Sequence, residues 1–176
     1  PTTTNKGLRY FPRQIIWIDP QIIKLYDPIR LFSGIYYIQN DNWDQNLREI
    51  REKPQFRVVD ELINQSIPID KLTDYEYTIN KLVRTKRIDR NKAIKLTIKK
   101  YNKVKLLIKK LKKNKNYKTQ MELGNSPHNK FNTWYDEIRV SICRDGKYIL
   151  NGSGNHRLFI AQKLGIKSVP VIVIRK

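Results

Sequence analysis

The sequence of 176 residues is poor in the side chains that build disulfides and metal sites, with one cysteine, Cys143, and two histidines. A single cysteine excludes an intramolecular disulfide and a cysteine-rich zinc site. No uninterrupted apolar stretch approaches the ~20 residues that a membrane-spanning helix needs. Residues 1–14 also lack the apolar core of a signal peptide. These absences predict a cytoplasmic protein with no membrane span, or one in the host cytoplasm if its source is a phage or virus.

Acidic residues are also scarce. The chain has 36 Lys and Arg against 16 Asp and Glu, a formal net charge of +20. Such a field attracts polyanions, including nucleic acid and nucleotides. An AT-rich genome would also produce the abundance of Lys, Asn and Ile. That alternative stays open, although it does not account for so few acids.

The pattern of apolar residues predicts an α/β protein in several segments. Residues 1–54 hold an N-terminal arm and the first part of a core. Strands are expected at 14–18 and 34–38, and a short helix from Ile22. Residues 55–115 read as a basic helical insert, residues 116–136 as a linker loop rich in Asn, Gly and Pro, and residues 137–176 as the rest of the core.

The insert shows helical spacing throughout. Thr73 and Glu76 match a capping box at the start of one helix. The longest predicted helix spans 89–115 and carries one apolar stripe, with lysines over most of its remaining surface. The stripe consists of Ile94, Ile98, Tyr101, Val104, Ile108 and Leu111.

The C-terminal segment combines strands with one helix. Residues 138–143 alternate as in a half-buried strand, with Ile138, Val140 and Ile142 on the apolar face. Asp145-Gly146 predicts a hairpin to a return strand at 147–150. A helix at 153–164 should end at Gly165. The apolar run at 169–174 predicts a strand buried on both faces.

The turn Gly152–Arg157 has the composition of a phosphate-binding site. Gly152 and Gly154 can expose backbone N–H groups at the start of a helix, where the dipole favours anions. Ser153 can cap the helix, and the Arg157 guanidinium can bind phosphate oxygens. His156 can bind phosphate or transfer a proton. An ordinary capped helix with a polar entry is the alternative, and no P-loop lysine is present.

Residues 137–176 resemble the core of the ParB/sulfiredoxin superfamily. The likeness rests on a glycine turn followed by G-x-[HR]-R, a helix with Ala161 and Leu164-Gly165, and a V-P-V-x-V strand at 169–173. It implies a small mixed sheet of ParB/sulfiredoxin type, interrupted here by the helical insert. The strand at 15–20 resembles the one that opens the domain in that superfamily.

Asn155 departs from the motifs of that superfamily. It stands where sulfiredoxins have their reactive cysteine, which argues against sulfinic-acid reductase activity. It also replaces the glutamate of CTP-binding ParB proteins, which puts CTP hydrolysis in doubt. The turn is more similar to the D-G-x-H-R motif of small-molecule kinases in the superfamily. A phage and plasmid branch with nuclease-like activity shares the loop as well.

Three acids near tryptophans are candidates for a catalytic carboxylate: Asp44, Asp136 and Glu137. For each, a structural role at the end of a strand is the favoured interpretation. His128 lies in the predicted linker and is interpreted as an exposed loop residue. Because the two histidines are far apart without acid pairs beside them, the sequence indicates no metal site.

Two functions follow as hypotheses. The leading one is a nucleotide-binding protein with ATP, ADP or CTP and Mg²⁺ on Gly152, Ser153, Gly154, Asn155, His156 and Arg157. It would act as a phosphotransferase or NTPase, with His156 as the catalytic residue. The alternative is a DNA-binding or nuclease-like protein of a mobile element, phage or virus.

In that alternative, Lys99, Lys103, Lys110 and Lys113 of the basic insert contact backbone phosphates. The absence of arginine after Arg90 in that helix favours backbone tracking over base readout. Alternatively, the same lysines form an ordinary solvent-exposed helix face with no binding role. A third option is a family member that has lost catalysis and serves as an interaction module.

Overall fold

The computed structural model describes residues 9–10, 15–28, 37–38, 42–64, 67–120, 122–123 and 137–175. These residues form a mixed α/β structure, which confirms the predicted class. The chain divides into two compact units. Unit 1 comprises Pro1–Glu52 and Tyr117–Lys176, and unit 2 comprises Lys53–Asn116. The bounds of unit 2 lie within two residues of those predicted for the insert.

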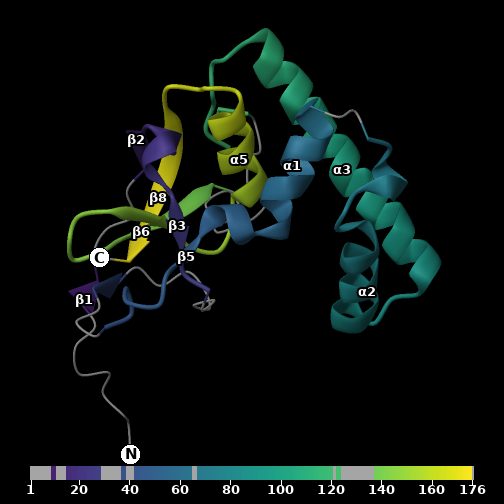
Figure 1. Ribbon diagram of the computed structural model, residues 1–176, viewed down its shortest axis with the longest axis horizontal. Coiled ribbons are helices and arrows are strands. Elements are labelled where there is room, and N and C mark those ends of the chain that lie inside the picture. The colour runs from purple at the N-terminus through teal and green to yellow at the C-terminus, as the bar shows by residue number, and fades with distance from the viewer. Residues whose placement is uncertain are drawn as a thin grey trace, which may run out of the picture. The chain divides into compact units, whose positions relative to one another are not determined.

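Unit 1 is built on a mixed sheet with the strand order β1-β4-β8-β6-β7-β3-β5, and β2 also pairs with β8 (Figure 1). The parallel pair of β6 and β8 lies at its centre, and β2 runs antiparallel to β8. The described strands are β1 (Arg9–Tyr10), β2 (Ile15–Ile18), β3 (Leu25–Tyr26), β4 (Tyr37–Ile38), β5 (Arg48–Glu49), β6 (Ile138–Ile142), β7 (Tyr148–Leu150) and β8 (Val169–Arg175).

The burial of the central strands largely follows their sequence patterns. Residues 169–173 of β8 are all buried, as predicted for a strand covered on both faces of the sheet. The alternation predicted for β6 is wrong at its end, because a register irregularity follows Val140. It places Ser141 in the interior, 0% exposed, where the Ser141 hydroxyl accepts a hydrogen bond of 2.9 Å from the Asn151 amide.

The helix predicted from Ile22 is wrong. The chain forms a short 3-10 helix, η1 (Pro20–Ile22), capped by the Asp19 carboxylate, and then enters β3. Of the strand predicted at 34–38, only β4 is described. The remainder lies outside the described residues, as do residues 121 and 124–136 of the predicted linker.

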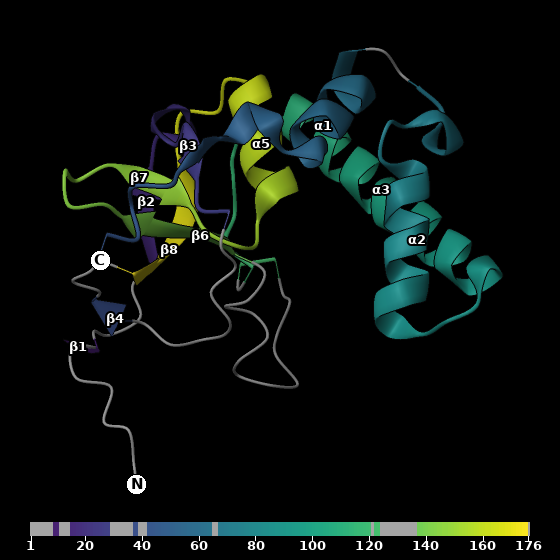
Figure 2. The ribbon, with the colours of Figure 1, turned by 60° about the horizontal axis from the view of Figure 1, so that its bottom comes forward.

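Unit 2 is helical. Its helices are α1 (Pro54–Asn64), α2 (Tyr75–Lys86) and α3 (Arg90–Lys113), with short 3-10 turns η2 (Ile50–Glu52) before the unit and η3 (Ile69–Lys71) within it. α2 and α3 pack side by side (Figure 2). Asp89 caps the start of α3, because its carboxylate accepts a hydrogen bond of 2.8 Å from the Lys92 N–H. None of the described helices in either unit is long and apolar enough to cross a membrane.

The buried face of α3 differs from the predicted stripe. Tyr101, Val104, Ile108 and Leu111 are buried as expected, together with Ala93 and Thr97. Ile98 is instead 39% exposed. The buried positions therefore define one side of α3, and Ile98 lies outside that side.

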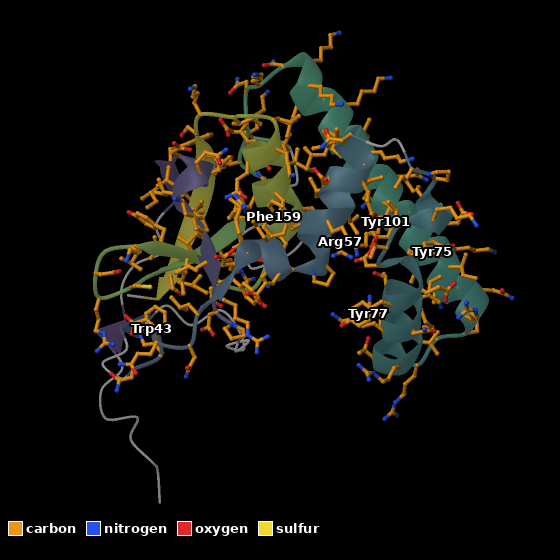
Figure 3. The ribbon with its side chains drawn as sticks, in the orientation of Figure 1. Trp43, Arg57, Tyr75, Tyr77, Tyr101 and Phe159 are labelled. Atoms are coloured by element: carbon orange, nitrogen blue, oxygen red, sulfur yellow. The ribbon has the colours of Figure 1, made fainter. Side chains whose placement is uncertain are left out.

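Polar groups are buried in the core of unit 2. The Tyr101 hydroxyl donates to the Asp74 carboxylate and lies 3.1 Å from the Thr78 hydroxyl. Figure 3 shows Tyr101 among the helices, whereas Tyr77, 56% exposed, points away from α3. Burial raises the pKa of Tyr101 above its usual value, so the hydroxyl keeps its proton.

The capping box predicted at Thr73 is wrong. α2 begins at Tyr75 after Asp74. The Glu61 carboxylate accepts hydrogen bonds from both the N–H and the hydroxyl of Thr73. Glu76 pairs with Arg90 at 2.8 Å. Both members of the predicted box therefore have tertiary partners, which local sequence spacing does not reveal.

Candidate functional site

The glycine turn lies between β7 and α5 (Asn155–Lys163) in unit 1. Gly152 and Gly154 both have a φ of +87°, a conformation that suits glycine. A Cβ on Gly154 would stand 2.4 Å from the Ile138 Cα, so the turn lies directly against β6. Gly154 itself precedes the helix, and no side chain caps its first turn. The prediction that Ser153 caps the helix is wrong, because its hydroxyl donates to the Glu137 carbonyl at 3.3 Å.

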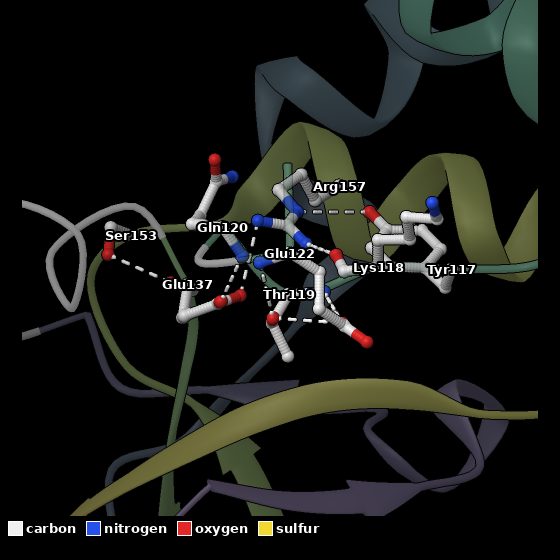
Figure 4. A network of polar contacts seen from close by, with 8 residues as sticks. All are labelled: Tyr117, Lys118, Thr119, Gln120, Glu122, Glu137, Ser153 and Arg157. Carbon is white, nitrogen blue, oxygen red and sulfur yellow. Dashed lines mark hydrogen bonds and ion pairs between the residues drawn. The ribbon is translucent and has the colours of Figure 1, made fainter. Parts of the chain in front are cut away.

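Arg157 is held inside unit 1 by a network of the protein's own groups (Figure 4). Its Nη1 lies 3.1 Å from Glu137 Oε2, and the two side chains are only 10% and 2% exposed. Arg157 Nη2 donates to the Lys118 carbonyl at 2.8 Å, and Nε donates to the Tyr117 hydroxyl at 3.3 Å. The Gln120 N–H donates to Glu137 Oε1 at 2.6 Å. The guanidinium therefore faces protein groups on several sides.

Burial also fixes the state of the tyrosine in this network. Tyr117 is 4% exposed, and the Arg157 guanidinium lies 5.0 Å from its ring centroid. Burial raises the pKa of Tyr117 to about 12, so its hydroxyl stays protonated at neutral pH. The network thus holds residues 117–120 on the first turn of α5 and the start of β6.

The predicted role of Arg157 as a phosphate ligand is not supported by this geometry. Its guanidinium is buried and paired with Glu137, so an external phosphate would have to displace an internal carboxylate. Breaking a buried ion pair costs about 3–5 kcal/mol, which a phosphate would have to offset. The anion beside this helix start is supplied by the protein itself.

The other predicted turn residues lie together but half-buried: Gly152, Ser153, Gly154, Asn155 and His156. Nucleotide binding at this turn stays a prediction, now without the charge of Arg157. His156 lies on the first turn of α5. In the parts of the chain that the structure describes, no group of three His, Cys, Asp or Glu residues can hold a metal ion. His128 and Asp136 lie outside the described residues.

The two described carboxylates considered as catalytic have ion-pair partners. Glu137 pairs with Arg157 as described above. Asp44 pairs with Arg144 at 2.7 Å, and the hydrogen bonds from that guanidinium hold the pKa of Asp44 below its usual value. Both pairs join segments far apart in the sequence, which fits the structural interpretation of these acids.

Most of the positive charge lies in unit 2. Residues 53–116 contain 19 Lys and Arg and 6 Asp and Glu, a net charge of +13 out of +20. α3 alone contains 11 basic residues and no acid. The four lysines predicted to contact nucleic acid are all exposed: Lys99, Lys103, Lys110 and Lys113. Unit 2 therefore concentrates cationic charge on one helix.

These lysines share a face of α3. Steps of three, four or seven residues place six exposed lysines along one line of the helix: Lys92, Lys95, Lys99, Lys103, Lys110 and Lys113. At 1.5 Å per residue the line is about 32 Å long. We call it the lysine stripe. It lies on the side of α3 opposite the buried residues such as Tyr101 and Val104.

Sequence reasoning missed a second feature of this face. Ile98, Asn102 and Leu106 follow one another at intervals of four residues beside the lysine stripe, and all three are exposed. The prediction had assigned Ile98 to the core. Leu106 falls outside the predicted core stripe, and its position in register with Ile98 was the available signal.

The chain was compared with family models, curated proteins and solved structures, and no match was found. The likeness to the ParB/sulfiredoxin superfamily therefore remains a resemblance of motifs.

Proposed function

We propose that this protein binds the phosphate backbone of nucleic acid through the lysine stripe of α3. The observation that carries the proposal is the stripe itself: six exposed lysines on a helix without a single acid. By contrast, the turn at Gly152–Arg157 has its guanidinium already paired. The geometry thus favours the nucleic-acid hypothesis over nucleotide binding.

The physical basis is the release of counterions. Each phosphate neutralised by lysine frees a condensed cation, so affinity falls steeply with salt. Six contacts predict a slope of log K against log salt of about −5 for duplex DNA. A nucleic-acid strand presents its charges in a line, and the ~32 Å length of the stripe matches such a partner better than a compact nucleotide.

The experiment is fluorescence anisotropy with a labelled duplex across a series of salt concentrations. The test variant replaces four stripe lysines by glutamine: Lys99, Lys103, Lys110 and Lys113. The control removes the same charge elsewhere, at the exposed lysines Lys24, Lys71, Lys86 and Lys167.

The test variant should lose most of the binding and about four phosphate contacts' worth of salt slope, roughly 3.6 units. The control should keep a salt slope close to that of the wild type, because binding through the lysine stripe depends on where the charges lie. Equal losses in both variants would show that net charge alone drives binding. Weak, salt-insensitive binding of the wild type would remove the proposal.

A further inference from the structure

The outer face of α3 carries two adjacent rows with a spacing of four residues. One is part of the lysine stripe, and we call the other the readout row: Ile98, Asn102 and Leu106. Together the rows line a shallow groove of about 520 Å³, formed by Lys95, Ile98, Lys99, Asn102, Lys103 and Leu106.

The readout row does not belong to the core. Ile98 is 39% exposed and Leu106 is 53% exposed, and Asn102 between them is exposed as well. The core side of the same helix segment is formed by Thr97 and Tyr101, both 0% exposed. The row therefore lies outside the buried core of unit 2, with much of its apolar surface open to a partner.

Contacts with backbone phosphates account for the lysines of the stripe but do not account for the readout row. Isoleucine and leucine gain nothing from an ionic phosphate, whereas the Asn102 amide could donate a hydrogen bond to one. The two apolar side chains are therefore the part of the row that phosphate contacts do not explain. A row that is apolar at both ends and polar at its centre suits a partner surface with methyl groups and paired hydrogen-bonding groups. The phosphates of that partner should lie to either side.

The floor of the DNA major groove has this chemistry. Thymine presents its C5-methyl group there, and adenine presents N7 and N6, which an asparagine amide can bind with two hydrogen bonds. An α-helix 10–12 Å across fits a groove about 12 Å wide. Helical geometry places Lys99 and Lys103 on one side of the row and Lys105 and Lys109 on the other, so both walls of the groove meet a cation.

Two other occupants fit less well. The major groove of A-form RNA is deep and narrow, and side chains cannot read it. A second copy of this chain would bring one lysine stripe against another, and like charges oppose that contact. Duplex DNA combines the required charge, width and methyl groups.

Resting on the proposed binding of nucleic acid, we infer that α3 enters the major groove of duplex DNA. The lack of arginine after Arg90 favours phosphate contacts by the lysines, and the readout row adds base contacts to them: the Asn102 amide reads adenine, and Ile98 and Leu106 contact thymine methyl groups. The protein is then a DNA-binding protein with a preference for A·T pairs that comes from the major groove.

The test uses the full chain and chemically altered duplexes that change only the major groove. A 20-base-pair A·T-rich duplex is compared with the same duplex containing deoxyuridine for thymidine, and with one containing 7-deazaadenine for adenine. Loss of one contacted methyl group should weaken binding about fourfold. Loss of the adenine N7 acceptor should weaken it about tenfold.

Asn102→Ala provides the matched variant. It should bind the normal and the 7-deazaadenine duplexes equally, with the salt slope unchanged, because no phosphate contact is lost. Lys99→Gln should instead weaken all duplexes by a similar factor and reduce the slope by about one. Asn46→Ala, at an exposed asparagine of unit 1, should leave every value unchanged.

The outcomes separate this inference from the proposed function. If wild-type protein binds DNA with a steep salt slope but does not distinguish the altered duplexes, the inference fails and the proposed function stands. Equal affinity for an RNA duplex of the same sequence also overturns the inference. If no nucleic acid binds, the proposed function is wrong, and this inference is wrong with it.

Discussion

The pair formed by Arg157 and Glu137 gives the sharpest test of how the C-terminal turn works. Replacing Glu137 with Gln keeps the shape of the side chain and removes its charge. The Arg157 guanidinium, 10% exposed, would then be buried without a counter-ion. Such a loss costs about 3–5 kcal/mol of folding free energy. With a urea slope of about 2 kcal/mol per molar, the unfolding midpoint should fall by about 2 M.

The assay is urea unfolding followed by tryptophan fluorescence. Trp17, Trp43 and Trp134 all belong to unit 1, which also contains the pair. The signal therefore reports on the unit under test and leaves the helices of unit 2 aside. Asp145→Asn, in the exposed pair with Lys147, is the control and should leave the midpoint where it is.

A double-mutant cycle completes the argument. Arg157→Met should also be strongly destabilising, because it leaves the Glu137 carboxylate, which is 2% exposed, without its ion-pair partner. The double variant Glu137→Gln with Arg157→Met should cost clearly less than the sum of the two single changes. If Arg157→Met leaves the midpoint unchanged and abolishes ATP or CTP binding, the guanidinium serves a ligand and our reasoning is refuted.

Two further stability predictions follow from the described packing. Gly154→Ala should destabilise unit 1 by several kcal/mol, since its Cβ would meet the Ile138 Cα at 2.4 Å; Gly152→Ala, which has the same φ but open space, should cost only about 1–2 kcal/mol. Fluorescence-detected urea unfolding would compare them, and equal costs would contradict the close approach. Tyr101→Phe should destabilise unit 2 by about 1–3 kcal/mol because Asp74 loses a buried donor, and circular dichroism at 222 nm would measure it. An unchanged helical transition would show that Asp74 finds another donor.

The parts of the fold that sequence predicted well are those set by local periodicity. The strand β8 follows from an uninterrupted apolar run, and the helix α3, 24 residues long, follows from apolar residues three to four positions apart. The end of α5 follows from the positive φ of Gly165. The exposure of Lys99 and Lys103 follows in the same way, since lysines opposite an apolar stripe face solvent. These features depend on neighbours within a few residues.

The features that sequence missed depend on partners far along the chain. Ser141 is buried because β6 shifts register and Asn151 reaches its hydroxyl. Thr73 does not cap α2 because Glu61 of α1 takes its N–H and hydroxyl. Periodicity also predicts Ile98 in the core, because helical spacing does not determine whether a residue at the edge of an apolar stripe is buried. Only packing shows which borderline position turns outward.

The Gly152–Arg157 turn shows why a cationic motif does not identify its anion. Glycines with positive φ, a helix start and an arginine favour a nearby negative charge, and the sequence alone predicts that this charge is a phosphate. Glu137 lies twenty residues before Arg157, at the start of β6, and sheet pairing brings it to the same corner. A carboxylate from the chain and a phosphate from solution satisfy the same guanidinium. Only the fold decides between them, and here it supplies the carboxylate, whereas the lysine stripe of α3 stays exposed to a partner.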